Sequence, residues 1–394
     1  MLDHLQHHAA LVVTLLLLLR FAQLLLHCLW SRRYQVLDAL IGSSQYTLLP
    51  SSYRAVEEGI IHVEGTDHAL DDHGHDHDHG PHDIVVVAQR WAIVTGASRG
   101  IGRAFVRKLS DQGFSLLCID RDDAELEDTV EVAKNRLERG WRGAVWPRTQ
   151  VMPTAVKVGC DVAHVEDAIA KIEQAIRTLP QGSLRLLVNN VGMSTAMPSL
   201  LAQHDAKEIE LMVHTNLLFA MQLTRALWPE LTVRTADCDD DRRSGILFLS
   251  SAASVVPAPY ASVYAATKGA INGFARALRA EALGLDVQLD VLAVTPGYVR
   301  AGNTPRWVHG SDGSAASDDS NLAEPGDVAR ACLLLLPTAT SATMHPFFAD
   351  AVKGLFAQYF LPESRLSNMV FERHQSQRQS LFGTNPTDCK TKTH

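Results

Sequence analysis

The chain has 394 residues, of which 46% are apolar, and its formal net charge is −8 at pH 7. This length and composition allow a full hydrophobic core in one large or two ordinary domains. The acidic balance, without any stretch dense in lysine and arginine, argues against nucleic-acid binding. The six cysteines are scattered without a CxxC pair, which predicts free thiols in a reducing compartment.

An apolar run from Ala9 to Trp30 comes first in the chain. It is long enough to span a bilayer, and Arg32 and Arg33 follow it, so the positive-inside rule places the downstream chain in the cytoplasm. Arg20 interrupts the run at a cost, which leaves an interfacial helix, a signal peptide and a transit peptide as alternatives. We expect an uncleaved anchor or an interfacial helix.

A stretch rich in histidine and aspartate, from Asp67 to Asp83, separates this run from the next apolar block. Alternating His and Asp can bind divalent metals, but the composition is also typical of a solvated linker that cannot form a core. No ligand geometry is fixed in such a segment. We therefore predict a solvated linker, in which any bound zinc would be loose and incidental.

A glycine-rich turn follows a buried-strand pattern at Trp91 to Val94 and leads into an amphipathic helix. Its spacing is TGxxxGxG. Glycine lets the backbone approach a pyrophosphate, and the helix N-terminus supplies N–H donors and a positive dipole end. In this context the spacing predicts a dinucleotide site rather than a plain tight turn. The candidate contacts are Thr95, Gly96, Ser98, Arg99, Gly100, Ile101 and Gly102.

The residues near the second predicted strand leave the choice of nucleotide open. Asp120 closes that strand, where a carboxylate would accept hydrogen bonds from the adenosine ribose and favour NAD(H). Arg99 and Arg121 favour NADP(H), because arginine pairs well with a 2'-phosphate. Asp161 ends the third predicted strand, VKVGCDV, either as a contact to the adenine amino group or as a strand-end or helix-cap aspartate.

Tyr264 and Lys268 lie four residues apart on a predicted helix, in the segment SVYAATKGAI. Side chains four apart share a helix face and lean toward the N-terminus, so Lys268 is directed at Tyr264. An ammonium there would stabilise a phenolate. Taken alone, the pair is more typical of an ordinary solvated helix face.

The predicted strand LRLLVNNVGMS ends in Asn190, Val191 and Gly192. TGxxxGxG, NNxG and YxxxK, in this order, resemble the short-chain dehydrogenase/reductase family over about residues 89–336. The resemblance implies an α/β fold with a doubly wound parallel sheet of the Rossmann type, and places Asn190 and Gly192 near the adenosine side of the cofactor. The expected divisions are a membrane anchor at 1–40, a linker at 41–88, the catalytic domain at 89–340 and a C-terminal helical extension at 341–394.

The resemblance also implies a catalytic group of four residues. Asn216 matches the helix asparagine that holds a water in the proton relay, and Ser251 stands thirteen residues before Tyr264, as the family pattern requires. Negative charge grows on a carbonyl oxygen as hydride arrives, so Ser251 and Tyr264 would donate hydrogen bonds and Tyr264 would then give its proton. Lys268 would lower the pKa of Tyr264, which is about 10 in a free tyrosine, and hold the nicotinamide ribose.

Beyond the catalytic helix, Pro296 and Gly297 form a turn that the resemblance places beside the nicotinamide, and Val299 is a further candidate cofactor contact. Ala301 stands where family members usually have threonine. Thr304 either compensates for it or leaves the carboxamide contact incomplete.

Two polar segments are predicted to be loops. The run from His309 to Asn321 follows where the family has its substrate loop, and is a mobile lid or an expanded loop. The acidic insertion from Thr235 to Ser244 is predicted to lie on the surface.

Two further residues indicate one branch of the family. Val191 replaces an alanine common in the family, and Trp91 starts the first strand, as in the very-long-chain 3-oxoacyl-CoA reductase and 17-beta-hydroxysteroid dehydrogenase branch. That branch implies an acyl-CoA or lipid substrate, NADP(H), a membrane segment, partners in fatty-acid elongation and a cytosolic catalytic domain. Asp120 departs from it, because the branch usually has a serine there.

The C-terminal region adds weaker support for a membrane setting. The aromatic run from His345 to Pro362 would dock on a bilayer, roof an acyl channel or pack on the core. Lys390 and Lys392 resemble the dilysine signal that returns membrane proteins to the endoplasmic reticulum.

These observations predict an endoplasmic-reticulum enzyme, with its catalytic domain facing the cytosol, that reduces 3-oxoacyl-CoA to 3-hydroxyacyl-CoA. The alternatives are a steroid, retinoid or 3-ketosphinganine oxidoreductase, and a catalytically silent membrane-tethered scaffold. A homodimer through the helices that include the Tyr-Lys helix is typical of the family.

Overall fold

The computed structural model describes the catalytic region and a short C-terminal segment. The described residues are 89–121, 124–143, 152–195, 199–232, 243–300, 322–339, 341–346, 364–365, 367–372 and 375. Several predicted features lie outside them: the membrane anchor, the His/Asp-rich linker, Ala301, Thr304, the loop from His309 to Asn321, most of the run from His345 to Pro362, and the dilysine tail. Of the helices that the structure describes, none has the length and apolar character to cross a membrane.

Seven parallel strands form one sheet in the order β3-β2-β1-β4-β5-β6-β7. They are β1 (Trp91–Thr95), β2 (Ser115–Asp120), β3 (Ala155–Gly159), β4 (Leu184–Asn189), β5 (Ser244–Leu249), β6 (Leu289–Val294) and β7 (Thr343–Met344). The chain leaves β1 in one direction through β2 and β3, and then returns to its other side as β4. Open α/β sheets bind ligands beyond the carboxyl ends of the strands at such a reversal. The predicted doubly wound parallel sheet is confirmed.

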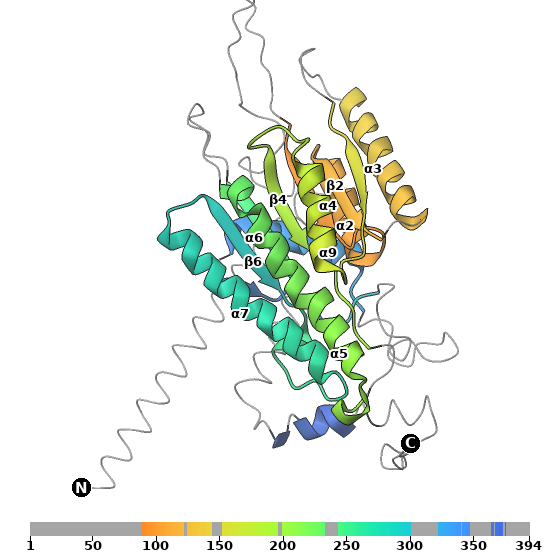
Figure 1. Cartoon of the computed structure of the whole chain (residues 1–394), viewed down its shortest axis with the longest axis vertical. Helices are drawn as coiled ribbons and strands as arrows, with labels where there is room; N and C mark the ends of the chain where they lie inside the picture. The colour runs from red at the N-terminus through yellow and green to blue at the C-terminus, as the bar shows by residue number, and fades with distance from the viewer. Residues whose placement is uncertain are drawn as a thin grey trace, which may run out of the picture.

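Helices cover both faces of the sheet (Figure 1). One layer contains α2 (Gly100–Asp111), α3 (Ala124–Gly143) and α9 (Pro325–Leu335), and the other contains α4 (Val165–Ile176), α6 (Phe219–Thr232) and α7 (Ser262–Gly284). A shorter helix, α5 (Ala206–Val213), precedes α6 and is joined to it by the π-helical turn η3 (His214–Leu218).

The strands are buried on both faces, and alternate residues enter two different cores. In β1, Ala92 and Val94 belong to the core beneath α2, α3 and α9, while Trp91 and Ile93 belong to the core with α4, α6 and α7. Because side chains alternate across a strand, this division follows directly from the sequence WAIVT. Near-continuous apolar runs are typical of parallel strands covered on both sides.

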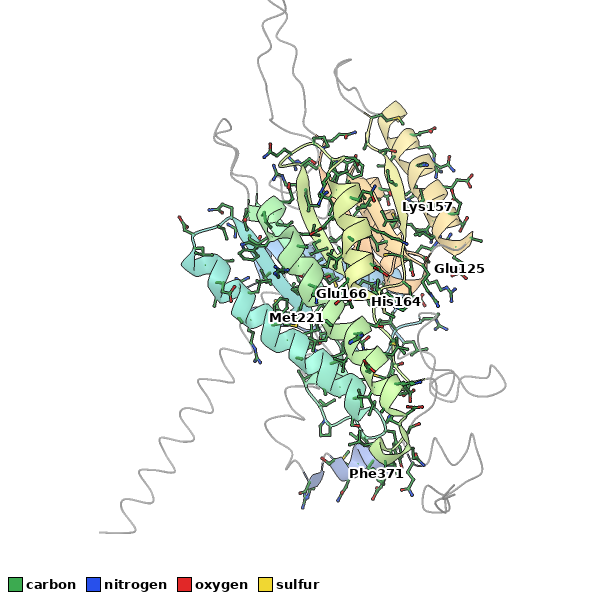
Figure 2. All side chains as sticks on the ribbon, viewed as in Figure 1. Glu125, Lys157, His164, Glu166, Met221 and Phe371 are labelled. Carbon is green, nitrogen blue, oxygen red and sulfur yellow. The ribbon has the colours of Figure 1, made fainter. Side chains whose placement is uncertain are left out.

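Three boundaries differ in detail from the predictions. β5 begins at Ser244, the last residue of the predicted acidic loop. β3 ends at Gly159, two residues before its predicted end at Asp161. The pairing of β7 with β6 carries the sheet to Met344, past the expected limit at residue 340. Residues 367–372, named here the C-terminal segment, are helical. Figure 2 shows Phe371 of this segment on the side of the molecule where α5 and α7 begin.

Candidate active site

Ser251 lies two residues after the end of β5, at the carboxyl edge of the sheet. Its hydroxyl caps the short 3-10 helix η4 (Ala252–Ser254) by accepting a hydrogen bond from the Ala253 N–H at 3.2 Å. Serine is a favoured cap because its oxygen satisfies an N–H that the helix leaves unpaired. The cap therefore holds the predicted oxyanion donor in place where the strand ends.

Tyr264 and Lys268 lie on the first two turns of α7. The Lys268 Nζ atom is 5.8 Å from the centre of the Tyr264 ring and donates a hydrogen bond of 2.7 Å to the Leu249 carbonyl. Lys268 is buried, whereas Tyr264 is half-buried. The lysine thus reaches from α7 to the last residue of β5, which brings the Tyr-Lys pair to the same edge as Ser251.

The pKa values of this pair are shifted mainly by desolvation, which disfavours the charged form. Burial lowers the pKa of Lys268 to about 8. Burial also raises the pKa of Tyr264 above 10, and a hydrogen bond with Ser251 opposes this rise. The Lys268 ammonium, which donates to the Leu249 carbonyl, is not among the causes of the tyrosine shift. The lowering of the tyrosine pKa by Lys268 stays a prediction.

Asn216 lies in the π-helical turn η3 and uses its side chain structurally. Its Oδ1 accepts from the Met193 N–H at 2.7 Å, and its Nδ2 donates to the Met193 carbonyl at 2.8 Å. These two hydrogen bonds fix the backbone just after β4. A Cβ atom on neighbouring Gly192 would lie 3.0 Å from Lys268 Nζ and 3.5 Å from Asn216 Oδ1. Gly192 therefore lies beside Asn216 and Lys268, whereas the resemblance implied a place near the adenosine side of the cofactor. The water-holding role of Asn216 stays a prediction.

Thr267 is a member of this cluster that the sequence did not indicate. Its buried hydroxyl accepts a hydrogen bond from Asn216 Nδ2 at 3.1 Å and donates one to the Tyr264 carbonyl at 2.8 Å. A helical threonine commonly bonds to a carbonyl one turn back, so no sequence signal distinguishes this one. Only the packing of η3 against α7 gives its hydroxyl a second partner.

The glycine loop lies at the carboxyl end of β1, where the strand order reverses. Gly96 and Gly100 have φ angles of 65° and 50°, which favour glycine. A Cβ atom on Gly102 would lie only 1.9 Å from the Gly96 carbonyl oxygen. The loop is closed from the other side by Asn190, whose Nδ2 donates to the carbonyls of Thr95 and Gly96 at 2.9 and 3.1 Å.

This loop fits the phosphates of a dinucleotide. Helix α2 begins at Gly100 after Arg99, and no side chain caps its first N–H groups. Such groups bind anions well. Ser98 Oγ is buried and has no hydrogen-bond partner in the part of the chain that the structure describes. Ile101 lies in the first turn of α2 and is half-buried.

The residues expected near the adenosine have partners of their own. Asp120 accepts hydrogen bonds from the N–H groups of Ser98 and Arg121, both at 2.9 Å. The Arg99 guanidinium is ion-paired with Glu125 at the start of α3. The Asp161 side chain accepts a hydrogen bond of 3.0 Å from the Ala163 N–H, two residues further on, as in an Asx turn. The N-cap of α4 is His164, so Asp161 does not cap that helix. Its contact to adenine stays a prediction.

The turn after β6 adjoins Ser251, the candidate catalytic serine. The Pro296 carbonyl accepts a hydrogen bond of 2.9 Å from Ala252, the residue after Ser251. Val299 is buried and pairs with Ala323 in an isolated bridge. The turn that contains Gly297 thus lies at the same edge of the sheet as Ser251.

Among the described residues, no group of three or more His, Cys, Asp or Glu side chains could hold a metal ion. Three cysteines occur in that part of the chain, and all are buried free thiols: Cys118, Cys160 and Cys332. Burial raises the pKa of Cys160 to about 11 and that of Cys118 to about 12. None of these thiols belongs to the cluster around Tyr264.

A doubly wound sheet with a glycine loop at its reversal and a Ser-Tyr-Lys cluster at the same edge defines an α/β oxidoreductase. Residues 90–311 match the short chain dehydrogenase family. The chain belongs to this family, the short-chain dehydrogenases/reductases.

Relatives of the chain fall into more than one group. A short-chain type dehydrogenase/reductase of Sinorhizobium fredii is 30% identical over 264 residues, which are 66% of this chain and 88% of that protein. Very-long-chain 3-oxoacyl-CoA reductase-A of Danio rerio is 32% identical over 194 residues, which are 49% of this chain and 53% of that protein. The match therefore spans about half the length of that reductase.

Solved structures share the fold at low sequence identity. A 3-ketoacyl-(acyl-carrier-protein) reductase from Brucella melitensis, solved in complex with NADH, has a TM-score of 0.53 at 22% identity and covers 66% of this chain and 96% of its own. A 7beta-hydroxysteroid dehydrogenase has a TM-score of 0.57 at 15% identity, covering 72% and 96%. At these identities the likeness concerns the fold alone.

Proposed function

We propose that the protein is a nicotinamide-dependent reductase that converts a long-chain 3-oxoacyl-CoA to the 3-hydroxyacyl-CoA. The observation that carries the proposal is the cluster of Ser251, Tyr264 and Lys268 at the carboxyl edge of the sheet. A bound nicotinamide would supply the hydride. The substrate class is supported by the similarity to very-long-chain 3-oxoacyl-CoA reductases.

The chain's own residues would handle the charge and the proton. Ser251 and Tyr264 would donate hydrogen bonds to the substrate carbonyl oxygen, where negative charge develops. Tyr264 would then transfer its phenolic proton to that oxygen. Burial raises the pKa of Tyr264, which favours the protonated form that donates to the substrate oxygen. Lys268 would stabilise the resulting phenolate and hold the nicotinamide ribose.

The nucleotide contacts would come from the glycine loop, with Gly96, Gly100 and Gly102 near the phosphates. We propose NAD(H) as the preferred form. The Asp120 carboxylate is held over the loop by the Ser98 N–H, where it would repel a 2'-phosphate, and Arg99 is engaged by Glu125. Arg121, which is exposed at the same edge, is the residue that would favour NADP(H).

The cellular setting is also a proposal, and it rests on sequence alone. The apolar run from Ala9 to Trp30, the following arginines, and Lys390 with Lys392 support attachment to the endoplasmic reticulum with the catalytic domain in the cytosol. A homodimer and partners in fatty-acid elongation would accompany that placement.

The proposal is tested by initial rates of the full chain, reconstituted in liposomes, on a long-chain 3-oxoacyl-CoA with NADH and with NADPH. Turnover with NADH at a kcat/KM at least about tenfold higher than with NADPH is expected, and Asp120→Ser should reverse that preference. Turnover with NADPH alone would overturn the cofactor assignment but leave the substrate class standing.

Two other outcomes would overturn the function itself. Absence of turnover together with oxidation of a steroid or retinoid alcohol would place the protein in another substrate class. Failure to bind either nucleotide, measured by calorimetry on the folded protein, would indicate a scaffold without catalysis.

A further inference from the structure

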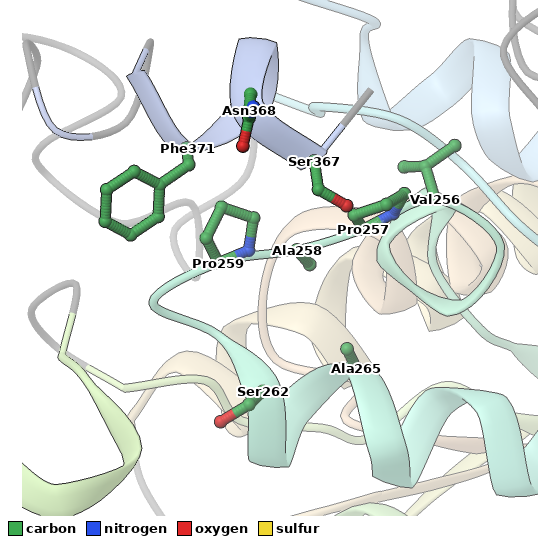
Figure 3. Close-up of a pocket in the computed structure, with 9 residues that line it drawn as sticks. All are labelled: Val256, Pro257, Ala258, Pro259, Ser262, Ala265, Ser367, Asn368 and Phe371. Atoms are coloured by element: carbon green, nitrogen blue, oxygen red, sulfur yellow. The ribbon is translucent and has the colours of Figure 1, made fainter. Parts of the chain in front are cut away.

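A cavity of about 480 Å³ lies between the loop from η4 to α7 and the C-terminal segment (Figure 3). Its size falls within the range of small-molecule sites, roughly 300–1,000 Å³. The loop, the first turn of α7 and the C-terminal segment all line it, through Val256, Pro257, Ala258, Pro259, Ser262, Ala265, Ser367, Asn368 and Phe371. Residues more than a hundred positions apart thus form one pocket.

An aromatic contact holds the C-terminal segment over the loop. The rings of Phe371 and Tyr260 are stacked, with their centres 5.3 Å apart and their planes 19° from parallel. Tyr260 is itself fixed, because its ring is buried and its carbonyl accepts a hydrogen bond from the Ser199 N–H at 3.2 Å. The family match ends at residue 311, so one wall of the pocket comes from beyond the matched region.

The lining shows which chemistry the pocket accepts. Among the nine lining residues that the structure describes, six have hydrocarbon side chains: Val256, Pro257, Ala258, Pro259, Ala265 and Phe371. The other three of these described residues are uncharged, so no lysine, arginine, aspartate or glutamate is among the nine. A phosphate or carboxylate would lose its hydration here without a charged partner, whereas an alkyl chain would gain from leaving water.

The pocket lies beside the catalytic group. Its loop begins five residues after Ser251 and leads directly into α7, where Ala265 follows Tyr264 in sequence. Consecutive helical residues are about 100° apart around the axis, so the Ala265 face adjoins the Tyr264 face. A flexible chain that starts at a carbonyl near Tyr264 could turn into the pocket.

We propose that this pocket binds the distal alkyl part of the acyl substrate, and that the C-terminal segment thereby sets the preference for long chains. The inference rests on the proposed function, because it assigns a subsite to that same substrate. The CoA portion, which carries phosphates, would remain outside the pocket.

The test compares kcat/KM on 3-oxooctadecanoyl-CoA and on 3-oxobutanoyl-CoA, using the full chain. Phe371→Ala removes the aromatic wall and Ala258→Leu fills the cavity, so each should lower the long-to-short ratio by about tenfold. Met369→Ala is the matched control, since Met369 is 60% exposed on the same segment and does not line the pocket. It should keep the wild-type ratio.

An unchanged ratio in both pocket variants, with an active wild type, would overturn the subsite and leave the proposed function standing. Binding of a dansyl-labelled long-chain fatty acid provides a readout that needs no turnover. If the wild type reduces neither substrate, the proposed function fails, and weaker probe binding in both variants would still support an alkyl site. Equal probe binding by all four proteins would overturn it.

Discussion

The glycine loop and the catalytic cluster lie at the same edge of the sheet but are built in opposite ways. The loop depends on missing side chains, because a Cβ on Gly102 would lie 1.9 Å from the Gly96 carbonyl oxygen. The cluster depends on side chains from separate elements, such as Asn216 on η3 and Thr267 on α7. A contiguous motif can thus specify the loop, whereas the cluster exists only after the sheet has assembled. Mutations in the cluster should therefore lower the catalytic rate, whereas mutations in the loop should lower nucleotide affinity and stability.

The largest expected effect is on the chemistry of the cluster alone. Tyr264→Phe removes the proton donor and should lower kcat by about 10²–10⁴. Nucleotide affinity, measured by calorimetry, should stay within about threefold of wild type, because the glycine loop is untouched. Full activity in this variant, with an unchanged circular dichroism spectrum, would refute the assigned role of Tyr264.

The matching change in the loop is Gly102→Ala. The added methyl meets backbone that cannot move aside, so nucleotide affinity should fall by about a hundredfold and the melting temperature should drop. Gly140→Ala on α3 is the control, because no atom lies within 4 Å of its Cβ position. It should leave binding unchanged and stabilise the fold by roughly 0.5–1 kcal/mol. Similar behaviour of the two variants would contradict the close approach in the loop.

The stability of the fold should depend on pH through the buried Lys268, whether or not the enzyme turns over. The pKa of Lys268 falls from 10.5 to about 8 on folding, so between these values the unfolded chain binds more protons than the native one. Stability therefore rises with pH across this window, by about 3 kcal/mol at most. Urea unfolding of wild type and Lys268→Met from pH 7 to pH 9.5 should show the difference growing in favour of wild type. A flat difference would mean that Lys268 is not desolvated.

The smallest effect is expected at Thr267, which acts through its neighbours. Thr267→Val removes the bonds to Asn216 and to the Tyr264 carbonyl, and should lower kcat by about tenfold, with Thr267→Ser restoring it. If Tyr264 moves away from Ser251, it loses the hydrogen bond that lowers its pKa. In the oxidation direction Tyr264 must lose its proton to act as a base, so the ascending limb of the pH profile should then move to higher pH. A reduced rate without that movement would indicate a purely structural role.

Features set by neighbouring residues could be predicted from the sequence, and contacts between distant elements could not. Strand β1, the glycine spacing and the Tyr264–Lys268 pair could be predicted, because each depends on near neighbours in the chain. The partners of Arg99 and Asp120 could not, because Glu125 and Ser98 reach them only across adjoining elements. The stacking of Phe371 on Tyr260 joins residues more than a hundred positions apart, and no local pattern signals it.

By itself, the sequence determined the layering of the sheet, the place of the glycine loop and the choice of candidate catalytic side chains. These follow from the periodicity of burial and from residue types at short spacings. The tertiary structure alone decided that desolvation dominates the pKa values of Tyr264 and Lys268, and that the C-terminal segment closes a pocket beside them. Desolvation and packing depend on every element that surrounds a group, so they arise only when distant parts of the chain meet.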